Sequence, residues 1–228
     1  MGFLVSILLP HNSWCVNDWA IQISKKNQVD IAYPDFAKAF DSIVHKKLLF
    51  KLKAYGVHGL FLNWIKSFLT DRIKRVRVGK CISDILTVTS GVPQDSVLSP
   101  ILFIVYINDL CNLSTKSQNV VTFKLFADEA KVYMSISNIQ SAELLQVCLN
   151  DISNWADMWQ LKLTPSKCSV LQLGKICVNN LYAINGVILP LVKNMSDLVI
   201  TVDNNLDFKL LVNNICVKAK QRASLILR

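Results

Sequence analysis

The sequence lacks the patterns that indicate a zinc centre, a disulfide framework or a membrane span. It has only 3 histidines, and its 7 cysteines include no C-x-x-C pair, so a zinc site has little support. The odd cysteine count favours reduced thiols in a cytoplasmic or nuclear protein that is not secreted. The apolar run at residues 3–9 is too short to cross a bilayer, and no basic residue precedes it as a signal peptide requires. A membrane partner is therefore not expected.

Internal repeats, low-complexity tracts and Gly/Ser-rich linkers are also missing, so the 228 residues are expected to form one domain, with at most a small appendage. Hydrophobic residues make up 52% of the chain and charged residues 18%, which is typical of a globular protein. Lys and Arg outnumber Asp and Glu by 25 to 16. This excess favours a polyanionic partner, either nucleic acid or an anionic membrane surface, although a basic protein with a solvated surface fits equally well.

The apolar periodicity predicts helices and strands that mix without regular alternation, which indicates an α+β fold. Helices are expected at residues 39–52, 60–69, 97–110 and 140–160. Strands are expected at residues 29–33, 73–78, 121–125 and 132–136. Gly56 stands where a helix C-cap glycine belongs, and Asn185-Gly186 is a strong hairpin signal.

Three acidic residues follow or interrupt the expected strands. Asp35 comes after one strand, and Asp128 and Glu129 lie at the turn of a hairpin. If these strands are neighbours, the carboxylates converge, and such oxygen ligands suit Mg²⁺. Two ions about 4 Å apart can activate an attacking hydroxyl and neutralise a leaving pyrophosphate. The residues alone leave another interpretation open, in which Asp35 caps the following helix and Asp128-Glu129 forms a solvated turn.

The order of three motifs along the chain and the residues that make them up favour the catalytic interpretation. Asp35–Asp41 reads DFAKAFD, Ser90–Gln94 reads SGVPQ and leads towards YINDL at Tyr106–Leu110, and Phe126–Asp128 reads FAD. In this order they resemble successive motifs of reverse transcriptases from non-LTR retrotransposons of the LINE-type, Jockey-like group. The resemblance runs from about residue 17 to residue 220 and therefore covers most of the chain.

The resemblance implies a right-hand polymerase palm that carries out RNA-directed DNA synthesis. The expected partners are an RNA template, a DNA primer and deoxynucleoside triphosphates. The expected cofactor is a pair of Mg²⁺ ions, for which Mn²⁺ can substitute. Asp35, Asp128 and Glu129 would be the catalytic carboxylates, and Asp35, Asp128 and the Phe36 carbonyl would hold the ions.

The resemblance also implies three residues that contact the incoming nucleotide. Phe40 would sit under its sugar and exclude a 2′-hydroxyl, Gln94 would contact the nucleotide, and Lys167 would lie near its triphosphate. If the family resemblance is set aside, the spacing of Phe40 fits an ordinary core residue equally well, and Lys167 is interpreted as an exposed loop lysine. The densest basic cluster is expected to follow the backbone of template or primer, or else to be a solvated strand face. Its members are Arg72, Lys74, Arg75, Arg77 and Lys80.

The expected domain organisation follows the family. Residues 1–34 would be a remnant of the fingers region, residues 35–175 the palm core, and residues 176–228 a post-palm hairpin with the start of a thumb connection. With partial fingers and little or no thumb, the chain would be a truncated copy that lacks an endonuclease domain.

Several residues depart from the family pattern, which implies a partly degenerate copy of doubtful activity. Glu129 stands where aspartate is usual, and Asp95 stands where the family has glycine. Further departures are Pro34, Ser99, Thr164 and Leu211. Two alternatives to an active polymerase stay open. One is a catalytically dead nucleic-acid-binding relic with the same fold, and the other is a lipidated membrane-surface protein, motivated by Gly2 and Ser6.

Overall fold

A five-stranded sheet forms the centre of the computed structural model, which describes residues 11–94, 96–113, 120–197 and 200–226. The strand order is β11-β8-β1-β7-β6. β1 is antiparallel to both β7 and β8, β6 is antiparallel to β7, and β11 is parallel to β8. The five strands are β1 (Gln28–Tyr33), β6 (Thr122–Phe126), β7 (Glu129–Ile136), β8 (Ser169–Leu173) and β11 (Leu191–Val192).

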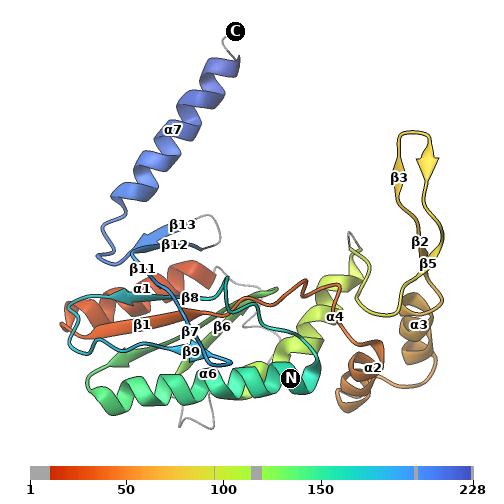
Figure 1. Ribbon diagram of the computed structural model, residues 1–228, viewed down its shortest axis with the longest axis horizontal. Helices are drawn as coiled ribbons and strands as arrows, with labels where there is room; N and C mark the ends of the chain where they lie inside the picture. The colour runs from red at the N-terminus through yellow and green to blue at the C-terminus, as the bar shows by residue number, and fades with distance from the viewer. Residues whose placement is uncertain (1–10, 95, 114–119, 198–199, 227–228) are drawn as a thin grey trace.

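Helices cover both faces of this sheet (Figure 1). α1 (His11–Ser24) lies on one face, and α6 (Ile139–Trp159) lies on the other. Because successive strand residues point to opposite faces, Val29 and Ile31 of β1 pack in the core beside α1, while Ala32 joins the larger core beside α6. All residues of β1 are buried, which fits a central strand covered on both sides.

The remaining helices and strands do not join the five-stranded sheet (Figure 1). Beside it lie the helices α2 (His45–Ala54), α3 (Gly59–Leu69) and α4 (Leu98–Ile107), and the 3₁₀-helix η2 (Asn108–Asn112). A hairpin arm, residues 73–87, projects beyond α3 and contains β2 (Ile73–Lys74), β3 (Arg77–Val78), β4 (Cys81–Ile82) and β5 (Leu86–Thr87). The C-terminal part contains β9 (Ala183–Ile184), β10 (Val187–Ile188), β12 (Asn194–Asp197), β13 (Ile200–Asp203) and α7 (Lys209–Ile226). Within the described residues, no helix is both long enough and apolar enough to span a membrane.

The α+β fold is confirmed, and so are most of the expected helices and strands, but the helix expected from residue 39 begins only at His45. Residues 37–42 form a turn instead, in which Lys38 has a φ of 45° and its carbonyl accepts a hydrogen bond from the Asp41 amide. Gly56, with a φ of 85°, ends α2 as expected. The Gly56 amide bonds the Lys53 carbonyl and the Val57 amide bonds the Leu52 carbonyl, which is the Schellman arrangement.

The strand expected at residues 73–78 is wrong in its middle. Arg75 and Val76 lie between β2 and β3, and Val76 bonds Ser83 instead: its amide donates to Ser83 Oγ and its carbonyl accepts from the Ser83 amide, both at 2.9 Å. The helix expected to reach residue 110 stops at Ile107 and continues as η2. The hairpin expected at Asn185-Gly186 is confirmed, with φ values of 52° and 75° at its two turn residues.

A buried lysine on α2 joins this helix to α4, η2 and α6. The side chain of Lys51 is only 6% exposed, and its ammonium lies 3.6 Å from the ring centroid of Trp159 and 5.2 Å from that of Tyr106. The ammonium also donates to Asp109 Oδ1 at 2.5 Å and to the Tyr106 carbonyl. Burial lowers the pKa of Lys51 to about 8, although Asp109 opposes this shift. The charge therefore holds α2 against α4, η2 and α6 at a desolvation cost.

Substituting Lys51→Met is expected to reveal that cost through the pH dependence of stability. Between pH about 8 and the ordinary value of 10.5, the unfolded chain binds more protons at Lys51 than the folded chain does. The unfolding free energy of the wild type, relative to the variant, should therefore rise through this window by up to about 1.4 kcal/mol per pH unit. Urea denaturation of both chains at a series of pH values measures the difference. A difference that stays constant with pH would show that the ammonium is not desolvated.

Candidate active site

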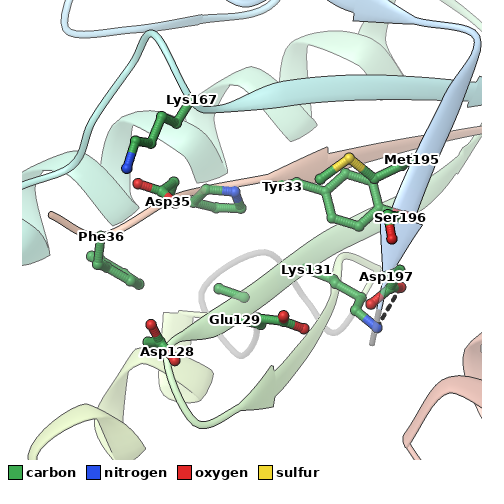
Figure 2. Close-up of a pocket in the computed structure, with 12 residues that line it drawn as sticks. Tyr33, Asp35, Phe36, Asp128, Glu129, Lys131, Lys167, Met195, Ser196 and Asp197 are labelled. Carbon is green, nitrogen blue, oxygen red and sulfur yellow. Dashed lines mark ion pairs between the residues drawn. The ribbon is translucent and has the colours of Figure 1, made fainter. Parts of the chain in front are cut away.

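A cavity of about 260 Å³ opens where β1, β7 and β12 end or begin (Figure 2). It brings together all three predicted carboxylates, the predicted Phe36 and the predicted Lys167. The lining residues are Tyr33, Pro34, Asp35, Phe36, Asp128, Glu129, Ala130, Lys131, Lys167, Met195, Ser196 and Asp197. This cavity is called the carboxylate pocket below.

Strand pairing explains why residues so distant in sequence meet here. β1 runs antiparallel to β7 with Ala32 opposite Val132, so the end of β1 lies beside the start of β7. Asp35 follows β1 directly. Phe126 pairs with Glu129, so the turn between β6 and β7 contains only Ala127 and Asp128. The turn is tight enough to require a φ of 50° at Ala127.

The expectation that both acidic residues lie in this turn is therefore only half right. Asp128 lies in the turn, while Glu129 is the first residue of β7. Figure 2 shows that the two carboxylates diverge: Glu129 extends towards Lys131 and Asp197, and Asp128 lies on the other side of the pocket. The partly buried setting raises the pKa of Glu129, helped by the negative charge of Asp197 and opposed by Lys131.

The backbone on either side of Phe36, directly after Asp35, is held by the segment that follows α6. Phe36 forms an antiparallel bridge with Leu163, in which the Thr164 amide donates to the Asp35 carbonyl at 2.8 Å. In the second bond of this bridge, the Ala37 amide donates to the Lys162 carbonyl at 2.8 Å. These bonds use the groups on both sides of Phe36 and not its own carbonyl.

The alternative that Asp35 caps a helix is wrong, since α2 begins at His45 with Val44 as its N-cap.

One oxygen of Asp35 has no hydrogen-bond partner among the residues that the structure describes. Oδ1 is buried and accepts no hydrogen bond. Leaving a buried carboxylate oxygen unpaired is costly, so it marks a place where a cation or substrate donor is expected. In the part of the chain that the structure describes, no group of three or more His, Cys, Asp or Glu side chains is gathered for metal binding. Mg²⁺ needs no such group, because it usually takes one or two carboxylates and completes its shell with water and substrate phosphates. Asp35 and Asp128 fit that requirement.

Two charged residues of the pocket were missed in the sequence. Lys131 and Asp197 are 1% and 3% exposed, and Lys131 Nζ lies 2.6 Å from Asp197 Oδ2. Lys131 had no sequence signal of burial, because it falls between the apolar positions of β7 and so looks solvent-facing in the alternation. Asp197 had none, since β12 is a short strand rich in polar residues.

A second cavity of about 390 Å³ contains other predicted residues. Gln94, Arg72 and Lys74 line it, so the structure does not place them in the carboxylate pocket. Three more of its lining residues are Lys38, Asp41 and Ser90. This cavity is called the basic pocket below. Gln94 is held there by its Nε2, which donates to Asp41 Oδ1 at 3.1 Å.

The predicted basic cluster is divided along the hairpin arm. Arg72 and Lys74 lie at its base in the basic pocket, whereas Arg75, Arg77 and Lys80 are exposed farther along it. The ring of Phe40 lines neither pocket. It stacks on Phe103 with ring centroids 4.4 Å apart, which agrees with its interpretation as a core residue.

The loop that carries Gln94 docks directly on the turn after Asp35. The Gly91 amide donates to the Ile43 carbonyl, the Val92 amide donates to the Phe40 carbonyl, and Ser90 Oγ donates to the Asp41 carbonyl. Gly91 has a φ of 85°, and a Cβ added there would lie 2.8 Å from the Asp41 backbone. Asp95, expected to hinder substrate binding, lies outside the described residues.

The chain matches the family described as reverse transcriptase (RNA-dependent DNA polymerase) over residues 10–211. It belongs to the reverse transcriptase family. Members of this family use divalent metal ions, which agrees with paired carboxylates in one pocket. The likeness confirms the family that the three motifs predicted.

Curated relatives place this reverse transcriptase chain among non-LTR retrotransposon proteins. It is 30% identical to the RNA-directed DNA polymerase from the mobile element jockey of Drosophila melanogaster, over 74% of this chain and 19% of the relative. It is 32% identical to the probable RNA-directed DNA polymerase from transposon BS of the same species, over 80% of this chain and 21% of the relative. The chain thus spans about a fifth of the length of these relatives.

Solved structures confirm the fold of the reverse transcriptase chain. Apo telomerase from Candida tropicalis superposes with a TM-score of 0.61 at 12% identity, over 89% of this chain and 37% of that one. Telomerase from Candida albicans, solved with a fragment of telomeric RNA, gives a TM-score of 0.58 at 14% identity, over 89% and 35% of the two chains. At such low identity the likeness concerns the fold alone.

Substituting Gly91→Ala is expected to destabilise the reverse transcriptase domain by about 2–5 kcal/mol, because the positive φ and the contact with Asp41 both oppose a Cβ. Gly186→Ala is the matched control. Its φ is 75°, but a Cβ there meets nothing within 4 Å, so only the conformational cost of about 1 kcal/mol remains. Urea denaturation of both variants measures the two losses. Equal losses would contradict the close docking of this loop.

Proposed function

We propose that this reverse transcriptase domain adds deoxynucleotides to a DNA primer on an RNA template, with two Mg²⁺ ions that Mn²⁺ can replace. The observation that carries the proposal is the buried, unpartnered Oδ1 of Asp35 in one pocket with Asp128. A non-catalytic pocket would normally satisfy such an oxygen with a donor. Because the chain is about a fifth of the length of its relatives, activity, substrates and partners are all proposed for this domain rather than inherited from them.

In this proposal Asp35 and Asp128 hold the metal ions, and the Phe36 carbonyl, which is free of the bridge to Leu163, adds a backbone oxygen. Bound ions would activate the primer hydroxyl and neutralise the leaving pyrophosphate. Lys167 is exposed, and Figure 2 shows its ammonium on the Asp35 side of the pocket. That position supports a role in binding the triphosphate and in stabilising the charge of the pyrophosphate as it leaves.

We assign the basic pocket to the nucleic acid and nucleotide phosphates. Lys38, Arg72 and Lys74 supply three cations there, and Gln94 supplies an amide held by Asp41. Such a concentration of positive charge attracts phosphates without regard to sequence. The outer arm, with Arg75, Arg77 and Lys80, would follow the template or primer backbone. The telomerase neighbour that contains an RNA fragment supports RNA as a partner for this fold.

Phe40 is proposed to exclude a 2′-hydroxyl from the nucleotide site. Its stacking on Phe103 fixes the ring, and a fixed ring discriminates by shape better than a mobile one. Phe40 also lies in the turn that supports the Gln94 loop, and its carbonyl accepts a hydrogen bond from the Val92 amide. The two roles are compatible.

The test is primer extension on an RNA template with deoxynucleotides and Mg²⁺ or Mn²⁺. Asp35→Asn should reduce incorporation by at least about 10²-fold, because it removes charge from the proposed ion site. Glu129→Asp should increase incorporation, because it restores the aspartate that is usual at this position. The longer side chain displaces the carboxylate by about 1 Å, and a displacement of this size can lower the rate by about 10²-fold. Asp157→Asn, which changes an exposed carboxylate on α6, is the matched control and should have no effect.

Equal incorporation by the wild type and Asp35→Asn would contradict the proposed ion site. If neither the wild type nor Glu129→Asp incorporates nucleotides, while both bind RNA with a steep salt dependence, the domain is the non-catalytic nucleic-acid-binding relic instead.

A further inference from the structure

The buried ion pair between Lys131 and Asp197 joins two parts of the carboxylate pocket. Lys131 belongs to β7, the strand that Glu129 begins, and Asp197 is the last residue of β12. Their side chains are 1% and 3% exposed, with Nζ and Oδ2 2.6 Å apart (Figure 2). Removing two charges from water costs nearly as much as their attraction returns, so such a pair adds little net stability. Stability alone therefore does not account for a charged pair in this wall.

The position of Glu129 suggests what the pair does. Lys131 follows Glu129 by two residues on the same strand, so both side chains emerge on the same face. Figure 2 shows the Glu129 carboxylate extending towards the Lys131–Asp197 pair. Within the described residues, the ion pairs include Lys131 with Asp197 but none that involves Glu129. Asp197 thus holds the cation that is best placed to neutralise Glu129.

We propose that Asp197 is a positioning residue that binds the Lys131 ammonium and thereby keeps the Glu129 carboxylate out of an ion pair and available to a divalent cation. This inference rests on the proposed function, because it assigns that cation to the polymerase site. Without the Asp197 charge, Glu129, which extends towards Lys131 from the same face of β7, is the carboxylate of the pocket that would pair with the ammonium. The carboxylate pocket would then lose, to an internal ion pair, the carboxylate that adds to Asp35 and Asp128 in attracting the cation.

The sign of the effect separates this role from a merely structural one. Asp197→Asn removes the carboxylate that competes with Glu129 for the Lys131 ammonium, so it should weaken metal binding. Lys131→Met removes the competing cation, so it should leave metal binding unchanged or tighter. If the ion pair served only stability, both variants would lose metal affinity.

The experiment is a titration of the purified chain with Mn²⁺ alone, followed by electron paramagnetic resonance, without nucleotide or nucleic acid. Asp197→Asn should raise the Kd for Mn²⁺ about 10-fold, which is typical for the loss of a supporting residue around a metal site. The same substitution should have no further effect in a Glu129→Gln background, where the contested carboxylate is absent. Asp197→Glu, which keeps the charge, should restore most of the affinity. Thermal denaturation of each variant verifies that it is folded.

The double variant Lys131→Met/Asp197→Leu keeps the test decisive if Asp197→Asn does not fold, because an apolar pair of similar volume is tolerated in place of a buried ion pair. It should bind Mn²⁺ at least as tightly as the wild type. A 10-fold weaker affinity in this folded variant or in folded Lys131→Met, or an unchanged affinity in folded Asp197→Asn, would overturn the inference.

The control Asp35→Asn distinguishes this inference from the proposed function. If Asp35→Asn leaves Mn²⁺ binding unchanged, the proposed metal site is wrong, and the role of Asp197 is wrong with it. If Asp35→Asn removes Mn²⁺ binding while Asp197→Asn and Glu129→Gln have no effect, the metal site stands and only the role of Asp197 is overturned.

Discussion

The antiparallel pairing of β1 with β7 is the constraint on which the candidate active site depends. It places Ala32 opposite Val132, so that Asp35 leaves one strand where Asp128 and Glu129 enter the other. A shift of this register by a single residue would turn every side chain of β1 to the opposite face. The two apolar cores, one beside α1 and one beside α6, prevent such a shift because each takes alternate residues of β1. The position of the carboxylates is thus maintained by apolar packing on both sides of the sheet.

The sequence predicted the parts of this arrangement that have strong local patterns. The β6–β7 hairpin alternates between apolar and polar residues, and α6 has a long buried stripe, so both could be found without a structure. The convergence of Asp35 and Asp128 followed from the order of the motifs. The turn at residues 37–42 was mistaken for helix because Ala39 and Ile43 are apolar at helical spacing, and both are buried although the backbone between them is not helical. The extended backbone of Val44, with a φ of −80° and a ψ of 113°, separates this turn from α2 and leaves no mark in the hydrophobic pattern.

What the sequence did not predict depends on contacts between distant segments. The separation of Gln94 from the carboxylates is set by the docking of Gly91 on Asp41, and local patterns do not report such contacts. The buried charges of Lys51 and Lys131 contradict the rule that lysines lie on the surface, and their partners are far away in the chain. The domain boundaries at residues 34 and 175 and the cytoplasmic or nuclear localisation stay predictions.

The hairpin arm differs from the sheet in how its stability is determined. In the described part of the chain, β2 to β5 pair only with one another, and Val76, Val78 and Ile82 are more than half exposed. Few buried contacts therefore oppose the local opening of the arm, whereas the central strands of the sheet are almost entirely buried. Backbone amides of the arm should exchange with solvent independently of global unfolding. Evolution can consequently change the length and charge of this arm without a penalty in the stability of the domain that carries it.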